Sequence, residues 1–261
     1  MANTIADKLT YLSGTKDAIK QAIIGKGVEV SDTDTFRSYA DKISSIQTGG
    51  GGTTNIPDGT RFAYSTFTTV SDSIIPYLEQ QTSMDCMFAY CQALKTVPLF
   101  DTSNVNDMYN MFYFCKALQT VPLFNTTNVT NMGRMFNNCQ KLQTVPQFDT
   151  ANVTNMQNMF AYCQKLKTVP LFDTSKVTDI KYMFSGCSSL INLGGFIGLK
   201  QDLDLSSSSL LTPDSIVNVI NNAADMTSSP KTLTLHKDVF NKLSEEQIAT
   251  ASAKGWNIAS K

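Results

Sequence analysis

The hydrophobic positions of this chain recur with a period of 24 residues. The segment Met-Phe-x-x-Cys begins at Met87, Met111, Met135, Met159 and Met183. A repeat this regular is typical of a solenoid, in which each unit buries its apolar face only against its neighbours. The pattern therefore predicts a stack of similar units in place of one globular core.

Each unit is expected to contain one short strand and one helical segment. The prolines at 98, 122, 146 and 170 exclude one continuous helix, since each would cost about 3 kcal/mol in a helix interior. The β-prone stretch Thr-Val-Pro-Leu-Phe predicts parallel strands around Val97, Val121, Val145 and Val169. The next apolar residues follow the three-and-four spacing of a helix: Val105, Met108, Met111, Phe112, Cys115 and Leu118. Asp101, Thr102 and Ser103 would cap that helix.

Stacking of these units predicts two columns of phenylalanine rings in the interior. One column holds Phe100, Phe124, Phe148 and Phe172, and the other holds Phe112, Phe136, Phe160 and Phe184. Terminal caps are expected because an open solenoid must cover the apolar face at each end. We assign residues 56–83 to the N-terminal cap, 84–199 to the repeats and 200–261 to the C-terminal cap.

The first 47 residues have a different pattern and precede a glycine run. Their apolar positions predict two or three short helices, and residues 48–55 have the composition of a flexible linker. A unit of this size buries too little apolar surface to be stable by itself, so we expect it to dock on another protein. The candidate attachment residues are Ile19, Ile23, Phe36, Tyr39 and Ile43.

Composition and charge exclude several classes of partner. The chain is 42% hydrophobic and 16% charged with a formal net charge of -1, as in ordinary soluble proteins. It has no basic run to follow a phosphate backbone or an anionic membrane, so nucleic acid and membrane insertion are not expected. Its start lacks a secretory signal, and no apolar window is long enough to span a bilayer, which together predict assembly in a cytoplasm.

Catalytic and metal chemistry is not expected from these residues. The cysteines stand at 86, 91, 115, 139, 163 and 187, and five of them share the repeat register, which predicts buried free thiols. His236 is the single histidine, so neither a zinc shell nor a nucleophile and base pair can be assembled readily. We predict no enzymatic activity, no metal and no cofactor.

Two polar features of the repeat have a structural and a functional interpretation. The column Asp101, Asn125, Asp149 and Asp173 is expected to form turns, with calcium binding as the alternative. The aromatic residues that vary between units are candidate contacts for a glycan or a protein, and partial burial against the next coil is the alternative. These candidate binding residues are Tyr90, Tyr109, Tyr113, Phe114, Tyr162 and Tyr182.

The repeats resemble leucine-rich repeats of the BspA-like branch, whose pattern is L-x-x-x-x-x-F-D-T-S-N-V-T-x-M-x-x-M-F-x-x-C. The matching stretches run from Leu94 to Cys115, Leu118 to Cys139, Leu142 to Cys163 and Leu166 to Cys187. The resemblance implies an α/β fold: a right-handed, leucine-rich-repeat-like solenoid of five 24-residue units with a parallel sheet. With it we expect terminal caps and a small helical N-terminal module.

The N-terminal module is similar to modules on tail fibres and other virion appendages of phages that infect gut bacteria. The similarity is carried by Ala22, Ile23, Lys26, Gly27, Val28, Val30, Thr35, Phe36, Tyr39, Ala40 and Ile43. It implies a multi-copy virion protein that binds other virion proteins through residues 1–47 and presents the solenoid to a host-surface glycan or protein. The alternatives are a bacterial surface or adhesion protein of the BspA-like family, and a decorative capsid or tail protein without a ligand.

Overall fold

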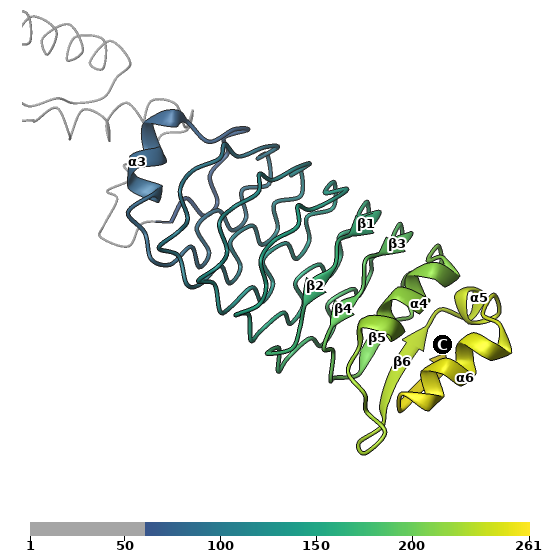
Figure 1. Ribbon diagram of the computed structural model, residues 1–261. Helices are drawn as coiled ribbons and strands as arrows, with labels where there is room; N and C mark the ends of the chain where they lie inside the picture. Colours follow the sequence, from purple (N-terminus) through teal and green to yellow (C-terminus); the bar gives the residue numbers. More distant parts are fainter. Residues whose placement is uncertain (1–60) are drawn as a thin grey trace, which may run out of the picture.

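The structure is a computed structural model that describes residues 61–261. They form an elongated stack of coils that runs from helix α3 to the helices near the C-terminus (Figure 1). The expected module at residues 1–47 and the linker at 48–55 lie outside the described residues. So do the five candidate attachment residues, Ile19, Ile23, Phe36, Tyr39 and Ile43.

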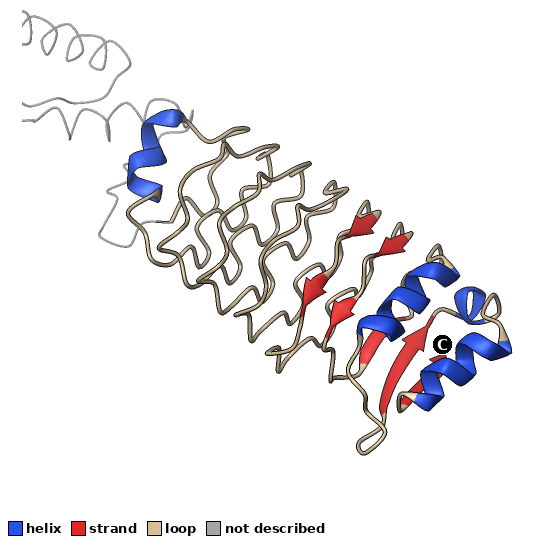
Figure 2. Ribbon diagram, viewed as in Figure 1, coloured by secondary structure: helices blue, strands red, loops and turns tan. Residues whose placement is uncertain are grey.

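Regular secondary structure is concentrated at the C-terminal end, and most of each earlier coil consists of turns (Figure 2). The N-terminal end has the 3-10 helix η1 (Asp72–Ile74) and α3 (Ile75–Leu78). The coils then contribute β1 (Thr168–Val169), β2 (Phe172–Asp173), β3 (Asn192–Leu193), β4 (Phe196–Ile197) and β5 (Leu203–Leu205). They are followed by α4 (Pro213–Asn222), β6 (Lys231–Leu235), α5 (Lys237–Phe240), α6 (Glu245–Ala253) and β7 (Trp256–Ser260).

Successive coils pair in parallel at a register of 24 residues. In the pairing of β1 with β3, Thr168 lies opposite Asn192, and in that of β2 with β4, Phe172 lies opposite Phe196. Earlier coils keep the same step through isolated parallel bridges such as Asp107 to Asn131. The predicted repeat solenoid with parallel pairing is confirmed, although β1 to β4 are only two residues long. Of the strands expected around Val97, Val121, Val145 and Val169, only the last forms, as β1, while Thr96 and Thr144 make isolated bridges.

The prediction of a helix over residues 105–118 is wrong, because this segment forms consecutive tight turns. Met111 N–H donates to Met108 O and Cys115 N–H donates to Phe112 O, at 3.2 and 3.0 Å, which are three-residue steps. The amide of Phe112 instead donates to the carbonyl of Met135 in the next coil, at 2.9 Å. Consecutive turns direct the same apolar side chains toward the interior as a helix does. The spacing of apolar residues therefore could not distinguish consecutive turns from a helix.

Without a helix, the expected N-cap residues have other roles. The side chain of Thr102 is buried, and its hydroxyl donates to the carbonyl of Asn125 in the next coil at 2.8 Å. Thr126 and Thr174 make the equivalent bonds to Asp149 O and Ile197 O. These threonines therefore join consecutive coils.

The two predicted phenylalanine columns are confirmed as the core. Phe112, Phe136 and Phe160 are fully buried, and neighbouring rings lie 5.7 Å apart between centroids. In the other column, the rings of Phe100 and Phe124 lie 5.1 Å apart. The columns also meet across the interior: the ring centroids of Phe136 and Phe148 are 6.2 Å apart, and those of equivalent pairs along the stack are 5.9 to 6.4 Å apart.

At the C-terminal end, β5, β6 and β7 form a separate three-stranded parallel sheet, and α4 contacts β3 and β4 (Figure 1). Thr212 caps α4 and Ser244 caps α6, the latter through a reciprocal capping box with Gln247. The ammonium of Lys254 donates to three carbonyls at the end of α4, those of Ile220, Asn221 and Ala223. These bonds fix the last helices against the stack, whereas the boundaries assigned to the caps stay a prediction.

Replacing one ring of the inner column tests its contribution to stability. Phe136→Ala removes ring contacts with Phe112, Phe148 and Phe160. It should therefore lower the free energy of unfolding by about 3–5 kcal/mol in urea denaturation. Leu123→Ala is the matched control, because that side chain is 59% exposed and the change should cost within about 0.5 kcal/mol. Equal losses in the two variants would contradict the assigned core.

Candidate functional site

Each coil passes through two positions of left-handed backbone on its turn surface. The first corner column contains the residue before each repeat cysteine and continues to Tyr64: Tyr64, Tyr90, Phe114, Asn138, Tyr162 and Gly186, with φ of 66, 61, 60, 62, 61 and 72°. The second corner column lies four residues earlier: Cys86, Asn110, Arg134, Asn158 and Tyr182, with φ from 54 to 59°. This conformation costs about 1–2 kcal/mol for most side chains, while glycine and asparagine tolerate it.

Three aromatic residues of the first corner column stack on one another. The rings of Tyr64 and Tyr90 lie 4.6 Å apart and 5° from parallel, and those of Tyr90 and Phe114 lie 5.2 Å apart at 25°. Tyr113 meets Tyr90 edge-on at 5.2 Å, and the ammonium of Lys116 lies 5.7 Å from the Phe114 ring. Both faces of Tyr90 are therefore covered by the chain itself, which favours packing between coils for Tyr90, Tyr113 and Phe114.

Tyr109 is also partly buried against the following coil. A Cβ placed on Gly133 would lie 3.0 Å from Cδ2 of Tyr109, so glycine there makes room for the ring. The guanidinium of Arg134 lies 6.0 Å from the centre of the same ring, within range of a cation–π contact. Tyr109 is thus covered on the side that faces the next coil.

Tyr162 and Tyr182 are the candidates that remain open to solvent. Their side chains are 51% and 62% exposed, and among residues 61–261 neither makes a ring contact with another aromatic residue. The stack and this exposed pair divide the six candidates into two groups. Sequence reasoning did not make that division, because it depends on which rings face each other across coils.

The cysteines are free thiols, and all except Cys86 are buried, as predicted. Each buried thiol donates to the carbonyl of the phenylalanine or equivalent residue one coil earlier. Cys115 Sγ lies 3.0 Å from Phe88 O, and Cys139 Sγ lies 3.2 Å from Phe112 O. Because the proton is used in this bond, the thiol connects two coils in addition to filling space. Cys91, Cys163 and Cys187 make the same contact.

Burial raises the pKa of every one of these thiols, because the thiolate would lose its hydration. The pKa of Cys91 and that of Cys187 are raised to about 12. The pKa values of Cys115, Cys139 and Cys163 are also raised by burial. Half-buried Cys86 has a raised pKa too, from burial and from the neighbouring Asp85 carboxylate. The thiol form therefore predominates at neutral pH, and thiolate chemistry is suppressed.

The polar column that begins at Asp101 forms turns, as predicted. The Oδ1 atoms of Asp101, Asn125, Asp149 and Asp173 each accept the N–H two residues further on, at 2.8 to 3.2 Å. This hydrogen bond lowers the pKa of Asp101 because it stabilises the carboxylate. A second turn column, at Asp107, Asn131, Asn155 and Asp179, makes the same bond.

Sequence reasoning missed a row of exposed leucines opposite the core. Leu99 and Leu123 are 63% and 59% exposed, although the phenylalanine that follows each and the valine two residues before it are buried. The amide of Phe124 donates to Pro122 O at 3.0 Å, a three-residue turn that directs Leu123 outward. Val121 and Phe124 are both buried although they lie three residues apart, so this segment does not follow the strict alternation of a strand, and the strand expected there gave no sign that Leu123 would be exposed.

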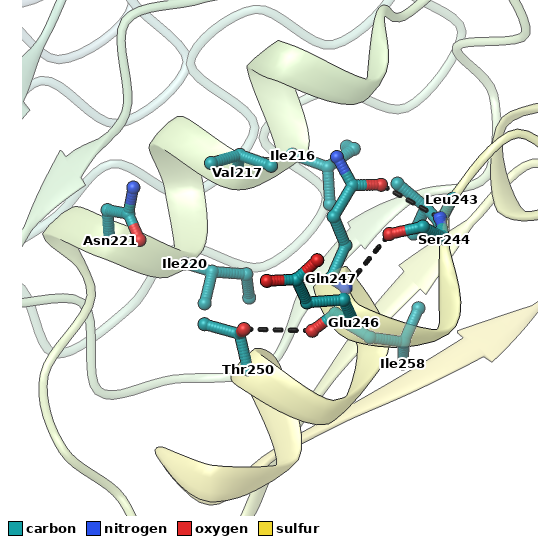
Figure 3. A pocket seen from close by; sticks show the side chains of 10 residues that line it. All are labelled: Ile216, Val217, Ile220, Asn221, Leu243, Ser244, Glu246, Gln247, Thr250 and Ile258. Carbon is teal, nitrogen blue, oxygen red and sulfur yellow. Dashed lines mark hydrogen bonds between the residues drawn. The ribbon is translucent and has the colours of Figure 1, made fainter.

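A groove of about 310 Å³ lies at the C-terminal end, between α4, α6 and β7 (Figure 3). Ile216, Ile220 and Ile258 contribute apolar side chains to its wall. The polar atoms of Ser244 and Gln247 bond each other in the α6 capping box, at 3.2 and 2.9 Å. Glu246 is the one titratable side chain in the lining, so the groove can bind but offers no acid and base pair.

Within the described chain, no three His, Cys, Asp or Glu side chains are grouped as metal ligands would be. His236 directly follows β6, and its Nδ1 accepts the backbone N–H of Asp238 at 3.2 Å as the cap of α5. Residues 61–261 also include no helix with the length and apolarity that a bilayer span requires.

Comparison with known proteins identifies one similarity, over the repeats. Residues 82–194 match the model of a family described as "Mycoplasma protein of unknown function, DUF285". Neither a curated protein nor a solved structure matches the chain. The matched residues include both corner columns except Tyr64.

The thiols should differ sharply in reactivity between the folded and unfolded chain. At pH 8 a thiol-specific colorimetric reagent should label at most Cys86 in the native protein and all six cysteines in denaturant, because five are buried with raised pKa. Cys86→Ser should abolish the native reaction and leave the other five accessible only on unfolding. Rapid native labelling of that variant would contradict the burial of the repeat thiols.

Stability should fall in alkaline solution because the unfolded chain loses its thiol protons first. The folded pKa values are raised above the ordinary value of about 8.5, so the stabilisation is complete below that pH and declines above it. At pH 10 each buried thiol should contribute a loss of about 2 kcal/mol in the free energy of unfolding. The Cys139→Ser variant keeps a hydrogen-bond donor that does not titrate. Between pH 8 and 10 its free energy of unfolding should therefore fall by about 2 kcal/mol less than that of the unchanged protein. Identical losses for the two proteins would refute the assignment.

Proposed function

We propose that this protein is a virion structural protein of a phage, of the tail-fibre or head-fibre type. Residues 1–47 anchor it to the particle, and the solenoid displays a binding surface to the host. The proposal is supported by the resemblance of the N-terminal residues to virion appendage modules. It localises the protein to the virion, after assembly in the host cytoplasm.

The observation that carries the display role is the division of each repeat into a constant interior and a variable turn surface. The phenylalanine and cysteine positions repeat because they pack or bond to the next coil. At equivalent positions of different coils, the first corner column changes from Tyr90 to Asn138 to Tyr162 without altering the backbone conformation. A surface that varies on a fixed frame suits recognition better than catalysis, for which the described residues offer no acid and base pair.

We also infer the finer architecture of the repeat. The coils form five units of the leucine-rich-repeat type and wind in the right-handed sense. The support is the BspA-like pattern together with the general preference of parallel strand connections for right-handed crossovers. Terminal caps on this array keep it from extending by end-to-end association.

The partners in this proposal are of two kinds. Other virion proteins bind residues 1–47, and a host-surface glycan or protein contacts the solenoid. Many copies on one particle would combine weak contacts into strong attachment. The interspersed charges and the net charge of -1 give no support to nucleic acid as a partner or to membrane insertion.

A bacterial surface or adhesion protein is the second candidate, and the family similarity favours it. The description of the matched family names the bacterium Mycoplasma. In that case residues 1–47 would serve attachment within the bacterial envelope. A decorative virion protein would share the fold and lack a ligand.

Removing residues 1–47 tests the anchoring role. Mass spectrometry of purified particles should detect the full chain and should show the shortened chain reduced by about tenfold or more, since loss of the docking contacts removes most of the binding free energy. The double variant Phe36→Ala and Ile43→Ala should act in the same direction. Tyr64→Ala, at a 70% exposed side chain outside the module, is the control and should incorporate normally. Recovery of the protein in host envelope fractions and not in particles would favour the bacterial candidate.

A further inference from the structure

The first corner column contains one aromatic residue whose left-handed backbone is not offset by ring stacking. Tyr64, Tyr90 and Phe114 occupy this strained conformation and recover free energy by stacking on each other. Asn138 and Gly186 are residue types that tolerate it. Tyr162 has only these two as column neighbours, so its ring has no stacking partner in the described chain. Residues held in strained backbone conformations cluster at functional sites.

Tyr182 presents the same situation on the next coil. Its φ is 59°, its side chain is 62% exposed, and no other aromatic ring of residues 61–261 contacts it. The amide of Tyr162 donates to Ser185 O at 2.6 Å, and that of Asn158 donates to Lys181 O at 2.9 Å. These bonds align the coil of Tyr162 with the coil of Tyr182, so both tyrosines stand on adjacent coils of one surface.

Gly186 leaves room between the two coils at this point. A Cβ at Gly186 would lie 2.8 Å from Cδ1 of Tyr162, which is closer than two carbon atoms can approach without a shift, and 3.3 Å from Cε1. The ring of Tyr162 therefore lies over Gly186 and toward the coil that contains Tyr182. Any larger residue at position 186 would displace the ring.

We propose that Tyr162 and Tyr182 form a stacking site for the rings of a neutral oligosaccharide. This inference rests on the proposed display function and gives its ligand a chemical class. Exposed tyrosine faces bind the flat C–H face of a pyranose, and their hydroxyls bond its hydroxyls. On the same coils, Asn158, Gln164 and Ser185 offer neutral hydrogen-bonding groups, and the exposed Lys181 beside Tyr182 adds an ammonium that can donate to sugar hydroxyls.

The stack at the other end of the column has a different role. Tyr90 has one ring face against Tyr64 and the other against Phe114, so a sugar cannot stack on it. Tyr90, Tyr113 and Phe114 are therefore structural, and ligand contact is confined to the exposed pair.

Titration of the full chain with defined neutral hexasaccharides tests the site. Maltohexaose, cellohexaose, mannohexaose and chitohexaose are added up to about 10 mM, which detects dissociation constants in the millimolar range, and calorimetry or tyrosine fluorescence follows binding. At least one should bind, and Tyr162→Asn and Tyr182→Asn should each weaken it about tenfold or more. Because asparagine tolerates the left-handed backbone, both variants should keep or raise the melting temperature.

Tyr90→Asn is the matched control at the equivalent backbone position. It should lower the melting temperature, since it breaks the stack, and change the saccharide dissociation constant by less than about twofold. Absence of binding by all four hexasaccharides, or binding unaffected by Tyr162→Asn, would overturn the proposal. The proposal would also be overturned if an oligothymidylate bound more tightly than the hexasaccharides. The same holds if Tyr162→Asn lowered the melting temperature as much as Tyr90→Asn does. The titration uses no particles, so its failure leaves the anchoring role of residues 1–47 to be judged separately.

Discussion

The stacking of each coil on the next at a constant step of 24 residues is the constraint on which the rest of the structure depends. Along the turn surface, alternate amides donate to the following coil while those between them close turns within their own coil: Phe112 N–H bonds Met135 O, and Tyr113 N–H bonds Asn110 O. Backbone groups in a dry interior must find partners, and neither a helix nor a long strand supplies them here. One slipped residue would separate every such pair.

This register explains why so few residue types can occupy the interior. A phenylalanine placed under another phenylalanine is covered on both faces, and a cysteine can give its proton to the carbonyl one coil earlier. Buried threonine hydroxyls do the same in the other direction. The side chains thus repeat because each unit has to satisfy the polar groups and fill the space presented by its neighbour.

The same register leaves the outer surface free to vary, and it decides which exposed groups act together. Side chains one period apart are neighbours, so Tyr64, Tyr90 and Phe114 cover each other while Tyr162 stands over a glycine. On the opposite side, the exposure of Leu123 follows from a three-residue turn at Pro122, and the same turn recurs at Pro146. A recognition surface on such a molecule therefore consists of side chains from several consecutive coils.

The sequence by itself determined the solenoid, its 24-residue step, the two phenylalanine columns, the buried thiols and the turns at Asp101 and its equivalents. Those features follow from periodicity and from residue chemistry, which are readable without coordinates. Only the tertiary structure decided that residues 105–118 form turns, because consecutive turns and a helix bury the same apolar positions and differ in where their amides bond. It alone separated Tyr162 and Tyr182 from the stacked Tyr90 and Phe114, since the exposure of a ring depends on the residue 24 positions away that covers it.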